Sequence, residues 1–209
     1  MCTAHNYLPK IAKCDDVEIV SGVAFCQDAG IEAHIDAIKN ASEAYCFIYN
    51  NEGSVRFNTV EDCSFISAAE WFRWDYIIIH LNINASDDKC RASELAMIIK
   101  NICPSACVVL SAPYGVAADI ADELAVLPVS EACEAAEAAG VVIVDADGSF
   151  RGREYGFITA GVWYEALSGN ALTANSYRLP FVAGELTVLM KNAVHNTVDG
   201  IKNRCFNGR

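Results

Sequence analysis

The sequence predicts an α/β fold, with a parallel sheet covered by helices on both faces, and two patterns support this. Short apolar runs rich in β-branched residues recur along the chain, and segments with helical periodicity lie between them. Strands that alternate with helices favour a parallel sheet, and unbroken apolar runs favour strands buried on both faces. The predicted strands are residues 17–20, 45–49, 76–81, 107–110 and 141–144.

The helices between these strands are predicted from the spacing of apolar residues. Ile31, Ile35 and Ile38 lie on one helical face, and Leu95, Ile98, Ile99 and Ile102 lie on another. Further helices are predicted around residues 120–124 and 132–139, over 155–167 with Gly169 as a left-handed C-cap, and over 184–198. No repeat, low-complexity tract or linker divides the 209 residues, so we expect a single domain over residues 1–209.

Composition narrows the classes of protein. The hydrophobic fraction is 53% and the mean hydropathy +0.22, but charged residues interrupt every apolar stretch, so no membrane partner is expected. The net charge of -12 opposes binding to nucleic acid. The N-terminus has no apolar signal region, which predicts a cytoplasmic protein.

The cysteines and the loops give no sign of a bound metal or cofactor. The ten cysteines are scattered through apolar segments and are expected to be mostly buried free thiols. Cys103 and Cys107 are a close pair, but neither a second pair nor a nearby histidine completes a zinc set. No glycine-rich phosphate loop indicates a nucleotide or a flavin, so we expect no cofactor.

The ligand crevice of an open parallel sheet lies outside the carboxyl ends of its strands. The segments that should line it here follow the predicted strands, at residues 21–26, 50–54, 80–84 and 145–150.

Four blocks in these segments resemble the SGNH, or GDSL-like, hydrolases, in particular an uncharacterised bacterial branch. The first is Ile-Val-Ser-Gly-Val-Ala-Phe-Cys-Gln-Asp-Ala over residues 19–29, which is similar to a block centred on Gly-Asn-Ser-Phe. Gly22 and Phe25 match this block, whereas Val23 and Ala24 stand where asparagine and the nucleophilic serine belong. The second block is Asn-Glu-Gly-Ser over residues 51–54, in which Gly53 matches the glycine that supplies an oxyanion-hole amide.

The third and fourth blocks follow the same pattern of partial agreement. Residues 74–80, Trp-Asp-Tyr-Ile-Ile-Ile-His, resemble a strand that ends in an oxyanion-donating glutamine or asparagine, a place that His80 takes here. Residues 145–150, Asp-Ala-Asp-Gly-Ser-Phe, and the helix over 156–169 resemble the family's Asp-Gly-x-His block and the helix after it. Asp147 and Gly148 are kept, but Phe150 occupies the histidine's place.

The resemblance implies a three-layer αβα, flavodoxin-like fold and a chain that has lost ester hydrolysis. A serine nucleophile needs a base and oxyanion donors, and neither alanine nor phenylalanine can replace these groups. We therefore predict a binding or structural domain, in which Gly53, His80 and Asp147 contact a small-molecule or carbohydrate ligand and which could form homo-oligomers. The alternative is an active esterase or acetylesterase with His80, Asp147 and Cys26 or a serine in rearranged roles. A third alternative is an unrelated flavodoxin-like fold.

Several other residues have a simpler structural interpretation. Asp147 with Gly148 could merely close a turn, and His80 could be an ordinary hydrogen-bonded histidine. Cys26 is expected to be a buried thiol, and neither Ser21 nor Ser149 lies in a nucleophile-elbow motif. His5, His34 and His195 are interpreted as surface or capping histidines.

Overall fold

A computed structural model describes residues 4–15, 21–26, 31–40, 45–51, 54–69, 76–80, 89–111 and 125–205. The chain divides into two compact units, one of Met1–Glu18 with Pro128–Arg209 and the other of Ile19–Leu127. Each unit is described by itself, and the single domain over residues 1–209 stays a prediction. No helix among the described residues is long and apolar enough to cross a membrane.

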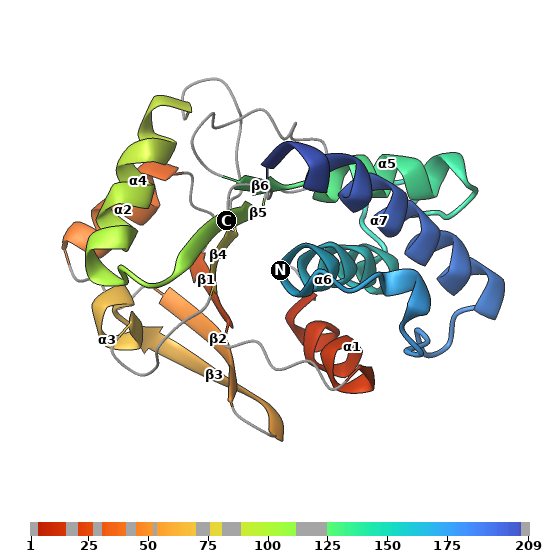
Figure 1. The fold of residues 1–209 in the computed structure, drawn as a ribbon, viewed down its shortest axis with the longest axis horizontal. Helices are drawn as coiled ribbons and strands as arrows, with labels where there is room; N and C mark the ends of the chain where they lie inside the picture. The colour runs from red at the N-terminus through yellow and green to blue at the C-terminus, as the bar shows by residue number, and fades with distance from the viewer. Residues whose placement is uncertain are drawn as a thin grey trace. The chain divides into compact units, whose positions relative to one another are not determined.

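The unit of Ile19–Leu127 is built on a six-stranded sheet with the strand order β3-β2-β1-β4-β5-β6 (Figure 1). Strands β1, β4, β5 and β6 pair in parallel, whereas β2 runs antiparallel to β1 and β3 antiparallel to β2. The strands are β1 (Ser21–Cys26), β2 (Tyr45–Asn51), β3 (Ser54–Cys63), β4 (Tyr76–His80), β5 (Cys107–Ser111) and β6 (Ala125–Leu127).

The predicted α/β class is confirmed, but the predicted five-stranded parallel sheet is wrong in three respects. β2 pairs antiparallel with β1. It also forms an antiparallel hairpin with β3, because only two residues join Asn51 to Ser54. The short strand β6 was not predicted. Residues 141–144 form no strand of the sheet, and only an isolated bridge joins Val144 to Phe150. The predicted strand at residues 17–20 lies outside the described residues.

The best-predicted strands form the centre of this sheet. β4 and β5 match the predicted runs and pair in register from Tyr76 with Cys107 to His80 with Ser111. Ile77, Ile78 and Ile79 are completely buried, as their unbroken apolar character required. β1 occupies residues 21–26, which the sequence had placed in a loop after the first strand.

The helices of this unit are α2 (Ile31–Lys39), α3 (Phe65–Ala69) and α4 (Lys89–Ile102), and Figure 1 shows α2 beside α4. Ile31, Ile35 and Leu95 are completely buried, which confirms the predicted apolar faces. Ion pairs from Lys39 to Glu94 (2.7 Å) and from Arg91 to Glu32 (2.5 Å) join the two helices at the surface. That helices cover the second face of the sheet stays a prediction.

The other unit is helical. Its helices are α1 (Leu8–Cys14), α5 (Val129–Ala138), α6 (Gly152–Ser168) and α7 (Gly184–Cys205), with short 3-10 turns at Ala4–Asn6 (η1) and Leu172–Ala174 (η3). The sequence predicted α5, α6 and α7, and the predicted C-cap Gly169 has a φ of 78°. Helix α6 contacts α1, α5 and α7 (Figure 1), and Phe157, Trp163 and Tyr164 are completely buried.

Gly161 permits the closest contact in this helical unit. A Cβ atom at this position would lie 2.5 Å from Cδ2 of Leu172 and 3.4 Å from Cγ2 of Val194, and both of these side chains are completely buried. We expect Gly161→Ala to lower the free energy of unfolding by about 1–2 kcal/mol, because overpacking outweighs the gain in helix propensity. Urea denaturation measures this effect, with Gly152→Ala as the control, since nothing lies within 4 Å of that Cβ position. Equal stability of the two variants would contradict the prediction.

Candidate functional site

Two of the predicted site residues lie on neighbouring parallel strands. Phe25 of β1 pairs with His80, the last residue of β4, and Ala24 lies one register position earlier, opposite Ile79. His80 in turn pairs with Ser111, the last residue of β5, which is completely buried. The backbone therefore brings Ala24 and His80 to the carboxyl end of the parallel strands, where ligands of such sheets bind.

The segment around Gly53 lies elsewhere in the register. Gly53 itself is outside the described residues, but Asn51 and Ser54 on either side of it are paired in the β2–β3 hairpin. Because β2 runs antiparallel to β1 and Tyr49 already pairs with Gly22, the chain at Asn51 has passed to the amino end of β1. The prediction that residues 50–54 line the crevice at the carboxyl ends is therefore wrong for the described part of that segment.

Asp147 closes a tight turn in the helical unit. Its Oδ1 accepts hydrogen bonds from the backbone N–H of Ser149 (2.9 Å) and from the Ser149 hydroxyl (2.6 Å). These bonds, the hydroxyl first, lower the pKa of the Asp147 carboxyl. Gly148 has a φ of 83°, and its N–H donates to the carbonyl of Asp145. The carboxylate thus accepts hydrogen bonds within its own turn. This agrees with the interpretation of Asp147 as a turn-closing residue.

Phe150 follows this turn and leads into α6. Its side chain is 51% exposed, and the ring packs against Tyr155 at a centroid distance of 5.1 Å. A phenyl ring has no nitrogen that could take a proton, so this position supplies no base. Whether Asp147 and Phe150 meet Ala24 and His80 in one crevice stays a prediction, because the two pairs belong to different units.

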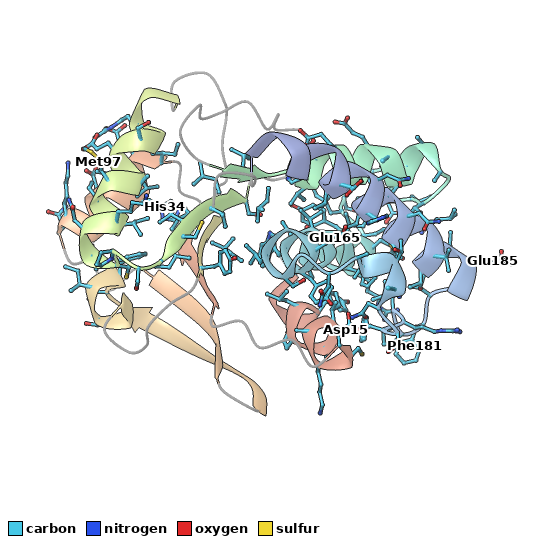
Figure 2. The ribbon with its side chains drawn as sticks, viewed as in Figure 1. Asp15, His34, Met97, Glu165, Phe181 and Glu185 are labelled. Atoms are coloured by element: carbon cyan, nitrogen blue, oxygen red, sulfur yellow. The ribbon has the colours of Figure 1, made fainter. Side chains whose placement is uncertain are left out.

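A carboxylate–imidazole pair that the sequence interpretation missed lies between α6 and α7. Glu165 is completely buried, and its Oε1 lies 2.7 Å from Nδ1 of His195, while its Oε2 accepts a hydrogen bond from the N–H of Leu172 (2.8 Å). Figure 2 shows Glu165 among the helices of this unit. His195 is partly exposed, at 35%, but it has an acidic partner that the sequence interpretation missed. The same interpretation of His34 as a surface or capping histidine is wrong, because His34 is completely buried.

The geometry of this pair orients the imidazole ring of His195. The contact from Nδ1 to Oε1 of Glu165 holds the ring in one orientation and leaves Nε2 as the nitrogen that faces away from the carboxyl group. Hydrolases orient a catalytic histidine in the same way. Among the described residues, however, no hydroxyl or thiol is hydrogen-bonded to this ring. The sequence did hold one signal, since Glu165 is a charged residue within an otherwise apolar helical segment.

A second buried polar cluster surrounds Asp15 at the end of α1. Oδ2 of Asp15 accepts hydrogen bonds from the hydroxyl of Tyr164 and from Nδ2 of Asn175 (2.7 Å). The same Asn175 nitrogen also donates to the carbonyl of Ile11 (2.9 Å), and Nζ of Lys191 donates to the Asn175 carbonyl. These bonds join α1 to α6 and α7.

Burial shifts the pKa of two groups in this cluster. Desolvation, and secondarily the charge of Arg178, lowers the pKa of Lys191, while Asp15 partly opposes the shift. Desolvation followed by the hydrogen bond to Asp15 raises the pKa of Tyr164. The lysine is 8% exposed, so it is poorly accessible to a ligand, and we interpret the cluster as structural.

The described residues offer no ready metal centre. No group of three or more histidine, cysteine, aspartate and glutamate side chains within them has an arrangement that could hold a metal ion. Cys103 and Cys133 are buried free thiols, as expected, and Cys107 and Cys14 are also free.

The fold defines an α/β protein. No protein-family model and no curated protein matches the chain. The crystal structure of a DUF4886 family protein from Bacteroides uniformis is similar in fold, with a TM-score of 0.76 and 15% sequence identity. The similarity covers 93% of this chain and 88% of that one. At this identity the comparison supports the fold and not a shared function.

Proposed function

We propose that this chain is an SGNH hydrolase-like domain that does not hydrolyse esters and acts as a binding or structural domain. The observation that carries the proposal is the Asp147 turn, where the family's histidine position holds Phe150. The carboxylate that would orient a catalytic base is occupied by Ser149 instead, and Phe150 packs on Tyr155.

Two further observations support the loss of catalysis. Ala24, at the position of the nucleophile, has no side-chain oxygen, yet its strand register places it next to the end of β4. The hairpin at Asn51 and Ser54 lies toward the amino end of β1, away from the place where an oxyanion donor would be needed. A ligand in such a crevice would be a small molecule or a carbohydrate, in line with the resemblance.

The test is the hydrolysis of p-nitrophenyl acetate. We expect the wild-type chain to be no faster than a matched non-catalytic protein, because nucleophile and base are both missing. The double variant Ala24→Ser with Phe150→His should hydrolyse the ester at least about tenfold faster than wild type, since a well-positioned base alone contributes roughly 10²- to 10⁴-fold. Each single variant serves as the control and should stay at the wild-type rate. An inactive double variant that folds normally would count against the proposed alignment of both blocks.

An active esterase with rearranged residues is the second candidate, and the Glu165–His195 pair is the observation that favours it. The ring of His195 is oriented by a buried carboxyl group, and its side chain is 35% exposed. If the wild-type chain does hydrolyse the ester, loss of that activity in His195→Gln would support this candidate. Activity that persists in His195→Gln but disappears in a His80 or Cys26 variant would place the reaction at the sheet.

A further inference from the structure

The turn before α7 carries an unusual aromatic residue. Among the described residues, Phe181 is the non-glycine residue with a positive φ, 62°, and its side chain is 93% exposed. Figure 2 shows it on the loop that precedes α7. A bulky side chain in the left-handed region is strained, and full exposure of a phenyl ring gains nothing in folding. A strained residue whose ring buries so little surface points to a role outside the fold.

Apolar residues continue on either side of this ring. Pro180 and Ala183 are exposed, Val182 is half-buried, and Val188 in the first turns of α7 is 54% exposed. The Phe181 turn, defined here as residues 180–183, is therefore an exposed apolar turn. Small-molecule sites bury most of their ligand in a pocket, so a fully exposed ring suits insertion into another surface better than capture of a small ligand.

One cation lies directly over the Phe181 ring, and others lie on the same helical unit. The guanidinium of Arg153 lies over the Phe181 ring at 5.4 Å, and Nζ of Lys10 lies over the Tyr7 ring at 5.8 Å. The charge of Arg153 also acts on the Tyr7 hydroxyl, which makes these two pairs neighbours. Among the described residues, no carboxylate pairs with the exposed side chains of Lys10, Lys13, Arg153 and Arg178. The acidic residues nearest them in the chain are Asp15, Glu154 and Glu185, and the Asp15 carboxylate already accepts hydrogen bonds from Tyr164 and Asn175.

We propose that the Phe181 turn and these cations form a peripheral docking site for an anionic lipid surface. The ring would insert at the headgroup boundary while the cations contact lipid phosphates, and stable membrane contact needs such a combination of two signals. The sequence-based expectation of no membrane partner concerned spanning segments, whereas this contact needs none. The net charge of -12 opposes approach, but screening over about 10 Å at 0.1 M salt leaves the nearest charges dominant.

The proposal is tested by sedimentation of the full chain with vesicles of phosphatidylcholine alone or with a quarter phosphatidylglycerol. We expect binding to the anionic vesicles that falls as salt rises, and little binding to the neutral ones. Phe181→Gly should weaken binding about tenfold or more, the change expected for withdrawing one phenyl group from an apolar phase. Arg153→Gln with Arg178→Gln should weaken it by about 20-fold.

Two controls separate docking from folding. Glycine adopts the φ of residue 181 without steric strain, so the melting temperature of Phe181→Gly should be unchanged or higher while its vesicle binding falls. Met97→Ser, at a side chain 66% exposed on α4, should bind vesicles like wild type. The proposal is overturned if the wild type does not bind anionic vesicles at low salt, or if Phe181→Gly binds as well as wild type. It is also overturned if Phe181→Gly changes the oligomeric state without changing vesicle binding, which would identify a second copy as the occupant.

Discussion

Glu165→Ala is expected to lower the free energy of unfolding by about 3–5 kcal/mol. The substitution leaves the N–H of Leu172 without its buried acceptor and removes the partner of Nδ1 of His195, and it also opens a cavity in a fully buried position. Urea denaturation followed by circular dichroism measures the loss, and hydrogen exchange should place it in the amides of α6 and α7.

Glu165→Gln is the matched control, because it keeps the size of the side chain and an oxygen that can accept from Leu172. Its amide nitrogen can donate to His195 once the ring changes tautomer, so the expected cost is about 1–1.5 kcal/mol. If the alanine and glutamine variants were equally stable, the hydrogen bonds of Glu165 would contribute little. The same result would leave catalysis as the better reason for burying a carboxylate there.

The fold was most predictable where a single apolar pattern decided the structure. The runs at β4 and β5 and the apolar faces of α2 and α4 needed only periodicity, and all four elements lie where the sequence predicted them. The orientation of β2 could not be predicted in this way. A strand run has the same composition whether it pairs parallel or antiparallel, and only the pairing of β2 with β3 follows from the short link between them.

Residues 141–144 show another error, because this apolar run was predicted as a strand but is not part of the sheet. Val141 and Ile143 are buried, but Val142 is 46% exposed and the run leads directly into the Asp147 turn. The N–H of Arg151 donates to the Ile143 carbonyl and that of Asp145 to the Ser149 carbonyl, so the segment folds back on itself. Hydrophobicity predicted the burial of Val141 and Ile143 correctly, but not the exposure of Val142 or the pairing of the segment.

The candidate site was predictable only in its local parts. A turn at Asp147 and Gly148 follows from the residue types, and the structure has it. The bond between Glu165 and His195 joins residues 30 positions apart on two helices, and no local pattern specifies which face of each helix meets the other. The cluster around Asp15 could not be predicted from local patterns either, because its partners lie about 150 residues or more along the chain.

Asp15→Ala is expected to lower the free energy of unfolding by about 3 kcal/mol or more. The carboxylate accepts from the Tyr164 hydroxyl and from Asn175, so its removal leaves both donors without their charged acceptor in a largely buried setting. It also removes a negative charge that favours the charged form of Lys191. Urea denaturation measures the loss, and Asp36→Ala, at an exposed position of α2 in the other unit, is the control.

The pH dependence of stability gives this prediction a second readout. Burial lowers the pKa of Lys191 below its ordinary value of 10.5, so between the lowered and the ordinary pKa the unfolded chain binds more protons than the folded chain. Stability should therefore rise with pH across that window. Lys191→Met should abolish the rise while keeping the length of the buried side chain. Above pH 10 the raised pKa of Tyr164 acts in the opposite direction, because the folded state holds that proton more tightly.

Asp15→Asn separates the charge of Asp15 from its hydrogen bonds. The amide oxygen can still accept from Tyr164 or Asn175, so this variant should lose about 1–2 kcal/mol, less than the alanine variant. Without the carboxylate only Cys14 still opposes the lowering of the Lys191 pKa, and the window in which stability rises should begin at a lower pH than in the wild type. A window that does not move in Asp15→Asn would mean that Asp15 acts on Lys191 only through the packing of α1, and the electrostatic part of the argument would fail.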